Sequence, residues 1–226
     1  NDEIPPTIKN VQLAADNSTI AVTFDEAVYS TNNGSGALDT ADFVFSITGG
    51  AATLADTIPT SISINGNVYT LGIGLSGTPD GNEVVTVIPA ENAIYDAGGN
   101  VASTAQTNKT TSLFDQTAPN ITSVTLAADN STIAVVFSVA VFNTNGGSGA
   151  IDSTDFALSI TGGTATLSSA TPTSLSASGN TYTLGIGLSG TPNGSEVLKV
   201  NPVENAIYDA AGNPSDTTQS NNTINL

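Results

Sequence analysis

The chain has 226 residues, which is enough for two domains that each bury a small core. Its 20 acidic residues face three lysines, and the formal net charge of -17 argues against nucleic acid and anionic lipid as partners and favours cations. Cys, His, Met and Trp are absent, which excludes thiol and imidazole catalysis, zinc ligation and disulfides.

Apolar residues alternate with a period of two between turn residues, a pattern that is typical of a β-sandwich. Residues 38–43 have room for one helical turn. Asn65-Gly66 is predicted to form a type I′ hairpin turn, because both residues tolerate a positive φ. In chain order, the strands predicted in the first half are 8–13, 19–24, 43–48, 58–64, 68–75, 83–88 and 110–114.

The second half of the chain repeats the first after a shift of 113 residues without a gap. Residues 14–22, for example, recur as 127–135. The repeat predicts one domain over residues 1–115 and a second over 116–226. The short linker around Asp115 contains Pro119, so we expect the two modules to be held end to end with restricted movement.

Segments of both repeats carry a family resemblance. Residues 23–28, 94–100 and 115–119 resemble the Ig-like repeats of bacterial S-layer and giant cell-surface proteins, and residues 209–214 match their Asp-Ala-Ala-Gly-Asn-Pro motif. The resemblance implies an all-β fold of two tandem immunoglobulin-like antiparallel β-sandwiches. It also implies a location on the outside of a bacterial cell and a part in calcium-dependent adhesion.

Acidic residues are concentrated in the connections between the predicted strands. In an Ig-like topology, the loop between the second and third strands meets the loop between the sixth and seventh. Carboxylates that converge there would repel one another unless a cation lay among them, and Ca²⁺ takes roughly six to eight oxygen ligands. The sequence therefore predicts two groups of calcium ligands. Those of the first repeat, beside Asp2 and Glu3, are Asp39, Asp42, Glu91 and Asp96. Those of the second repeat are Asp152, Asp155, Glu204 and Asp209, together with Asp115 of the linker.

A second interpretation of these acids stays open, namely that they are solvated loop residues that cap turns. Asp25-Glu26 becomes Ser138-Val139 in the second repeat, so Glu26 is not an essential ligand of a site common to both.

We expect the chain to be a non-enzymatic spacer of an adhesin-like protein, stiffened by calcium at acidic loops and at the junction. No nucleophile and base can be paired without His or Cys. Near-identical copies favour a spacer, with neighbouring repeats as partners, no direct membrane insertion and a monomeric state. The alternative is an adhesion module that binds a glycan or a surface protein through the loops at 31–37 and 144–150.

Overall fold

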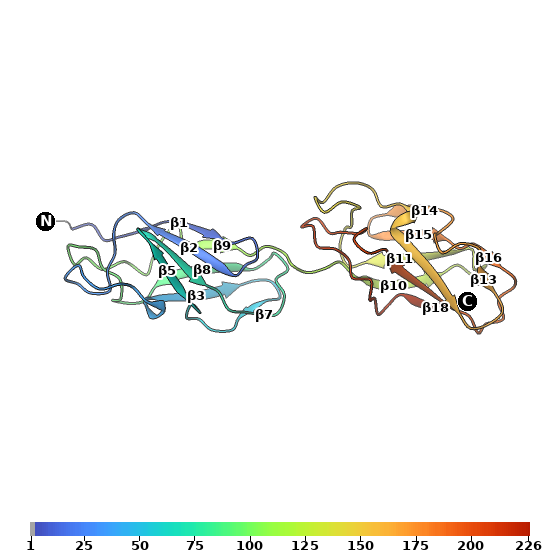
Figure 1. Cartoon of the computed structure of the whole chain (residues 1–226), viewed down its shortest axis with the longest axis horizontal. Coiled ribbons are helices and arrows are strands. Elements are labelled where there is room, and N and C mark those ends of the chain that lie inside the picture. Colours follow the sequence, from blue (N-terminus) through green and yellow to red (C-terminus); the bar gives the residue numbers. More distant parts are fainter. Residues whose placement is uncertain (1–2) are drawn as a thin grey trace. The chain divides into compact units, whose positions relative to one another are not determined.

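A computed structural model describes residues 3–226, and Asn1 and Asp2, including the predicted contribution of Asp2 to a metal site, lie outside the described residues. The protein is all-β, with several antiparallel sheets, and divides into two compact units, Asn1–Gln116 and Thr117–Leu226. The strands of the first unit are β1 Ile8–Leu13, β2 Thr19–Phe24, β3 Phe43–Thr48, β4 Thr53–Leu54, β5 Ile62–Asn65, β6 Val68–Gly72, β7 Leu75–Ser76, β8 Val84–Pro89 and β9 Thr110–Ser112 (Figure 1).

The second unit repeats these strands with every boundary shifted by 113 residues. They are β10 Ile121–Leu126, β11 Thr132–Phe137, β12 Phe156–Thr161, β13 Thr166–Leu167, β14 Leu175–Ser178, β15 Thr181–Gly185, β16 Leu188–Ser189, β17 Val197–Pro202 and β18 Thr223–Asn225. A single 3₁₀ turn precedes the third strand of each unit, η1 Thr40–Asp42 and η2 Ser153–Asp155. Neither turn has the length or the apolarity to cross a membrane.

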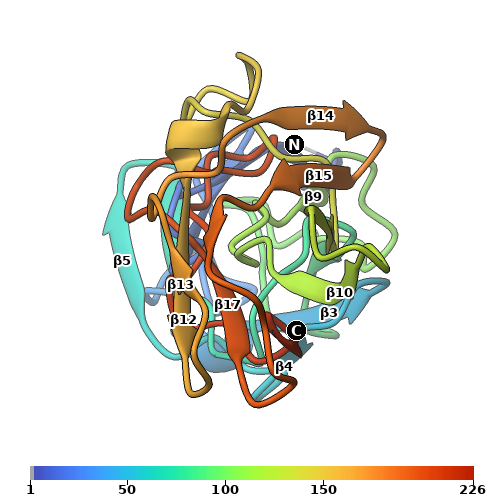
Figure 2. The ribbon, with the colours of Figure 1, turned by 90° about the vertical axis from the view of Figure 1, so that its right-hand side faces the viewer.

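Each unit has two main sheets and a small third one. In the first unit the sheet orders are β1-β2-β6-β5 and β3-β8-β9, with β4 and β7 paired separately. The second unit has the corresponding orders, β10-β11-β15-β14, β12-β17-β18 and β13-β16. Figure 2, in which the second unit faces the viewer, shows β14 and β15 in one layer and β12 and β17 in the other.

The core of the first unit lies between its two main sheets. Alternate residues of β2, among them Val22 and Phe24, face Phe43 and Val87 of the opposite sheet, and all four are at most 1% exposed. The Phe24 ring meets the edge of Tyr69 at a centroid distance of 5.7 Å and an interplanar angle of 88°. Phe137 and Tyr182 repeat this contact in the second unit at 5.9 Å.

The strands predicted at 8–13, 19–24 and 43–48 are confirmed without a change of boundary. The strand predicted at 58–64 begins only at Ile62, because Pro59 has no N–H to donate to a ladder. The segment predicted as one strand over 68–75 is divided between β6 and β7, which pair in different sheets. Gly72 and Gly74 lie where the chain passes from one sheet to the other.

The predicted hairpin exists, but its turn type was wrong. Asn65 is the last residue of β5 and pairs with Val68, so the two turn residues are Gly66 and Asn67. Among the described residues of this turn only Gly66 has a positive φ, of 59°. A positive φ at the first central residue alone defines a type II′ turn, which favours glycine there.

The chain enters each unit at one end and leaves it at the other. In the first unit, the N–H of Thr7 donates to Asp25 directly after β2, at what we name the proximal end. The chain leaves past Phe114, whose backbone bonds to Asn17 in the turn between β1 and β2, at the distal end. The two ends are therefore separated by the length of the β1–β2 hairpin.

Candidate functional site

The two loops predicted to carry metal ligands do meet at the proximal end. The backbones of Tyr29, in the β2–β3 loop, and Tyr95, in the β8–β9 loop, exchange two hydrogen bonds of 2.7 and 2.8 Å. Phe142 and Tyr208 exchange the same pair of bonds in the second unit. The predicted convergence of these loops is thus confirmed, and the placement of each carboxylate within them decides what they can do.

Asp39 and Asp42 lie together and cap the turn η1. Asp39 accepts from the Ala41 N–H at 2.7 Å, and Asp42 accepts from the Asp39 N–H at 2.7 Å, which completes a capping box. Burial, together with the nearby charge of Asp39, raises the pKa of Asp42 despite this hydrogen bond. Asp152 and Asp155 repeat the capping box in the second unit. Burial, together with the charge of Asp152, raises the pKa of Asp155, whereas the hydrogen bonds from Thr154 lower the pKa of Asp152.

Asp96 is fully buried, and its hydrogen bonds order its own loop. Its two carboxylate oxygens accept from the backbone N–H of Asn100 at 2.8 Å and from the Asn100 side-chain amide at 2.6 Å. Burial alone would raise the pKa of Asp96, but these bonds and those from Gly98 and Gly99 outweigh it and lower the pKa. Asp209 and Asn213 make the equivalent bonds at 2.8 and 2.9 Å.

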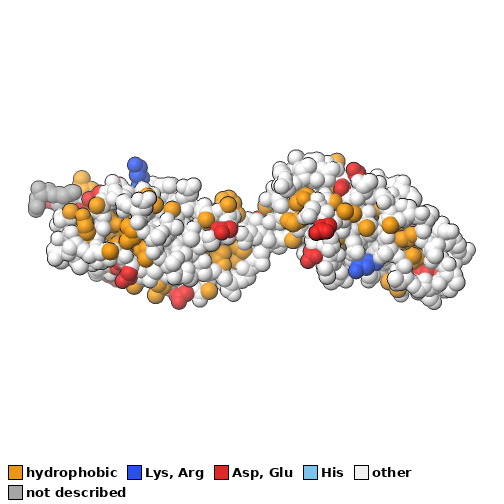
Figure 3. All heavy atoms as spheres, viewed as in Figure 1, with side chains coloured by type: hydrophobic (Ala, Val, Ile, Leu, Met, Phe, Trp, Pro, Cys, Tyr) orange, Lys and Arg blue, Asp and Glu red, His pale blue; other side chains and the backbone are white. Residues whose placement is uncertain are grey.

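The remaining predicted ligands are placed differently. Glu91 and Glu204 are exposed on their loops, whereas Asp115 lies at the distal end of the first unit, beside Gly81. Within residues 3–226 no three acidic side chains are grouped so that they could hold a metal ion by themselves. On the face of the first unit seen in Figure 3, at the left, the acidic side chains form separate spots. Calcium binding accordingly stays a prediction.

The loops proposed for glycan or protein contact use their polar groups internally. Thr31 Oγ1 donates to the carbonyl of Ser35 at 2.5 Å, and Thr144 donates to Ser148 in the same way at 2.6 Å. A Cβ added to Gly34 would lie 3.0 Å from the Ala97 carbonyl oxygen, so the first loop also packs closely against its neighbour.

The most completely bonded carboxylate is one that the sequence analysis did not select. Glu83 at the distal end has 0% exposure, and its side chain accepts hydrogen bonds of 2.8–3.2 Å from four backbone N–H groups, those of Ala51, Ala52, Asp80 and Gly81. Its own carbonyl accepts from the Leu113 N–H at 3.0 Å. One residue therefore joins two loops and the last strand.

Glu196 reproduces this centre in the second unit with the N–H groups of Thr164, Ala165, Asn193 and Gly194. The hydrogen bond from Ala165, with those from Thr164 and Asn193, outweighs burial and lowers the pKa of Glu196 from 4.5 to about 2. At Glu83 burial is the largest single influence, but the backbone hydrogen bonds again outweigh it and lower the pKa. Backbone hydrogen bonds thus hold both glutamates as anions.

A local signal for this centre is present in the sequence. Gly49 and Gly50, with φ of 77° and 60°, turn the backbone so that the following N–H groups point at the carboxylate, and a Cβ on Gly50 would overlap the Glu83 carboxyl group. Gly81 has a φ of 81° in the second loop. A pair of glycines and a second Gly-containing turn two residues before the glutamate recur in the other unit, at Gly162, Gly163 and Gly194.

No protein-family model matches the chain, and no curated protein sequence matches it significantly. Among solved structures, the chain is similar to the N-terminal part of the bacterial S-layer protein SbsC, at 15% sequence identity and a TM-score of 0.34. The alignment covers 99% of this chain, which spans 43% of the other.

Glu196→Gln is expected to destabilise the second unit and to change its response to acid. Because the folded pKa lies below the unfolded value of 4.5, the carboxylate stabilises the fold above that pH, and this stability is lost as the pH falls from 4.5 towards about 2. At neutral pH the substitution should lower the melting temperature of this unit by on the order of 10 °C, since buried N–H groups lose an anionic acceptor.

The measurement is calorimetry of the whole chain between pH 2 and pH 7. Exposed Glu204 in the same unit provides the matched control, Glu204→Gln, which should leave both the melting temperature and its acid dependence near those of the unsubstituted chain. Equal effects of the two substitutions would contradict the role given to Glu196.

Gly50 and Gly66 offer a matched pair with nearly equal φ, of 60° and 59°. Gly66→Ala meets no atom within 4 Å, so it should cost about 1–3 kcal/mol from backbone strain alone. Gly50→Ala adds an overlap with Glu83 and should cost more than about 3 kcal/mol. Urea denaturation of both variants measures these free energies of unfolding. Similar losses of stability would mean that Glu83 can move to make room for the added methyl group, which would contradict the prediction.

Proposed function

We propose that the chain is a non-enzymatic spacer segment of a protein on the outside of a bacterial cell. The observation that carries the proposal is the path of the chain, which enters each unit at the proximal end and leaves at the distal end. In the first unit these points are Thr7, held by Asp25, and Phe114, held by Asn17. A module with its termini at opposite ends can be joined to further copies so that each copy adds length.

The strand orders support an immunoglobulin-like assignment within this proposal. Sheets of β1-β2-β6-β5 and β3-β8-β9 correspond to the ABED and CFG sheets of a constant-type immunoglobulin domain. The surface location rests on the resemblance of the loop motifs to bacterial Ig-like repeats. A fold of this class serves many purposes, so the spacer role rests on the chain path and on the copying of the unit.

Calcium is part of the proposal at the pair of Asp39 and Asp42 and at the matching pair of Asp152 and Asp155. A cation is favoured there because the pKa of Asp42 is raised by burial and by the charge of Asp39, and a bound cation would offset both. Loop carbonyl oxygens and water would have to supply the other ligands. Asp96 and Asp209 serve this proposal less well, because both oxygens of each already accept hydrogen bonds from their own loops. The capping-box bonds of the proposed pairs use one oxygen of each carboxylate.

The spacer proposal can be tested by small-angle X-ray scattering from the whole chain, in calcium and in chelator. If calcium stiffens the chain, the largest dimension should be well defined in calcium and should spread when the metal is removed. An identical scattering curve in both solutions would remove calcium stiffening from the proposal. Binding of one defined sugar on a glycan array would instead favour an adhesion module.

Calcium binding itself is tested by the melting temperature. An ion that binds only the folded state adds about 2.7 kcal/mol of stability when its concentration is 100 times the Kd, so the melting temperature should rise with calcium and fall with chelator. The double variant Asp42→Asn with Asp155→Asn should lose this response, and the charge-matched control Asp56→Asn with Asp216→Asn, at two exposed residues, should keep it. The same melting temperature in millimolar calcium and in chelator would exclude the metal.

A further inference from the structure

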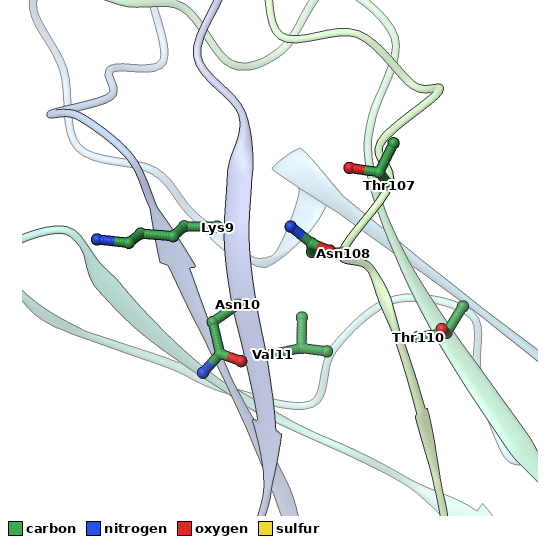
Figure 4. A pocket seen from close by; sticks show the side chains of 6 residues that line it. All are labelled: Lys9, Asn10, Val11, Thr107, Asn108 and Thr110. Atoms are coloured by element: carbon green, nitrogen blue, oxygen red, sulfur yellow. The ribbon is translucent and has the colours of Figure 1, made fainter.

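The first and last strands of the first unit are neighbours that do not share a ladder. β1 is the edge strand of one main sheet and β9 is the edge strand of the other, and the two lie side by side. Both run in the same direction, because Ile8 lies beside Gln106 at the proximal end and Asn17 lies beside Phe114 at the distal end. A hollow of 230 Å³ lies between the first half of β1 and the segment that leads into β9, lined by Lys9, Asn10, Val11, Thr107, Asn108 and Thr110 (Figure 4).

A side-chain amide joins the two chain segments at the distal end of the unit. Asn17 Nδ2 donates to the carbonyl of Phe114 at 2.8 Å, and the Phe114 N–H donates to Asn17 Oδ1 at 2.9 Å. Asn17 is 1% exposed and has a φ of 58°, which turns its amide towards the chain that leaves the unit. The amide bonds to Phe114 as a residue of a neighbouring strand would.

A second amide joins the segments at the proximal end. Gln106 Oε1 accepts from the Ile8 N–H at 2.8 Å, and its Nε2 donates to the Ser103 carbonyl at 2.8 Å. The side chain is 7% exposed, so these bonds are largely shielded from water. Gln219 accepts from the Ile121 N–H at 2.7 Å in the second unit, so this link is part of the repeated design.

We propose that Asn17 and Gln106 form a mechanical clamp that carries tension across the first unit. The proposal rests on the spacer function, because a spacer that tethers other domains is loaded through its two ends. Tension at Thr7 and Phe114 pulls β1 and β9 in opposite directions along their length. Because β1 and β9 belong to different sheets and share no ladder, the load between them falls on the two amides, one at each end.

The repeat supplies a control for the backbone contribution of Asn17. Asn130, the counterpart of Asn17 in the repeat, has the same φ of 58°. Within residues 3–226 the Asn130 side chain makes no hydrogen bond, and the residue is only partly buried. Asn130→Gly therefore measures the effect of glycine at this backbone position, whereas Asn17→Gly also removes the clamp.

The experiment is single-molecule stretching of the whole chain between its ends, with equilibrium unfolding of the same variants. Asn17→Gly should lower the force of one of the two unfolding events and raise its rate at constant force by roughly tenfold, the factor expected from two lost hydrogen bonds. The matched control is Val85→Ala, which weakens the core at a fully buried residue and leaves the clamp unchanged. It should lower thermal stability as much while changing the unfolding force less.

Gln106→Met keeps the length of the side chain and removes its acceptor, so it tests the proximal half of the clamp independently. It should also lower the unfolding force more than Val85→Ala does at equal thermal stability. The proposal is overturned if both clamp variants change the force no more than the core variant, or if Asn130→Gly costs as much equilibrium stability as Asn17→Gly. The stretching experiment reports on the clamp within one unit, whereas the scattering experiment reports on calcium stiffening of the whole chain. Either proposal can therefore fail while the other is supported.

Discussion

The fold depends on backbone hydrogen bonds that replace water around its buried carboxylates. Glu83 and Glu196 are fully buried in a chain with only three lysines, and four backbone N–H groups surround each carboxylate. Such a group can stay ionised only if hydrogen bonds replace the water that it loses. The requirement fixes the path of two loops, imposes glycine at Gly50 and Gly163, and ties both loops to the last strand through the backbone of the same glutamate.

The same principle organises the proximal end. Asp96 orders its own loop through Asn100, and Asp42 with Asp39 closes the turn that starts β3. Every buried side-chain nitrogen or oxygen among the described residues has a hydrogen-bond partner. Carboxylates here do much of what disulfides or larger cores do elsewhere, since each one orders several loop residues through bonds to a charged acceptor, which are stronger than bonds between neutral groups.

Much of the fold could be predicted because the alternation of β2 and β3 and the 113-residue repeat are local properties of the sequence. Pro59 shows where alternation misleads, since it removes a ladder donor inside an apolar run. The site was harder to predict. The topology brought the expected loops together, but the direction of each carboxylate depends on nearby N–H groups, and Glu83 was passed over because a glutamate that begins a strand looks like a solvated residue.

These features have a consequence for a segment under tension. Bonds from the backbone to carboxylates and amides sit at the ends of the unit, where the chain enters and leaves, whereas the apolar core lies between the sheets. Dispersion and burial in the core resist separation of the sheets but have little directionality along the strands. Hydrogen bonds are directional and short in range, so those at the ends are loaded first when the chain is pulled. The core therefore contributes to thermal stability more than to resistance along the strands, whereas the bonds at the ends contribute to both, so a change in the core can alter stability with little effect on the unfolding force.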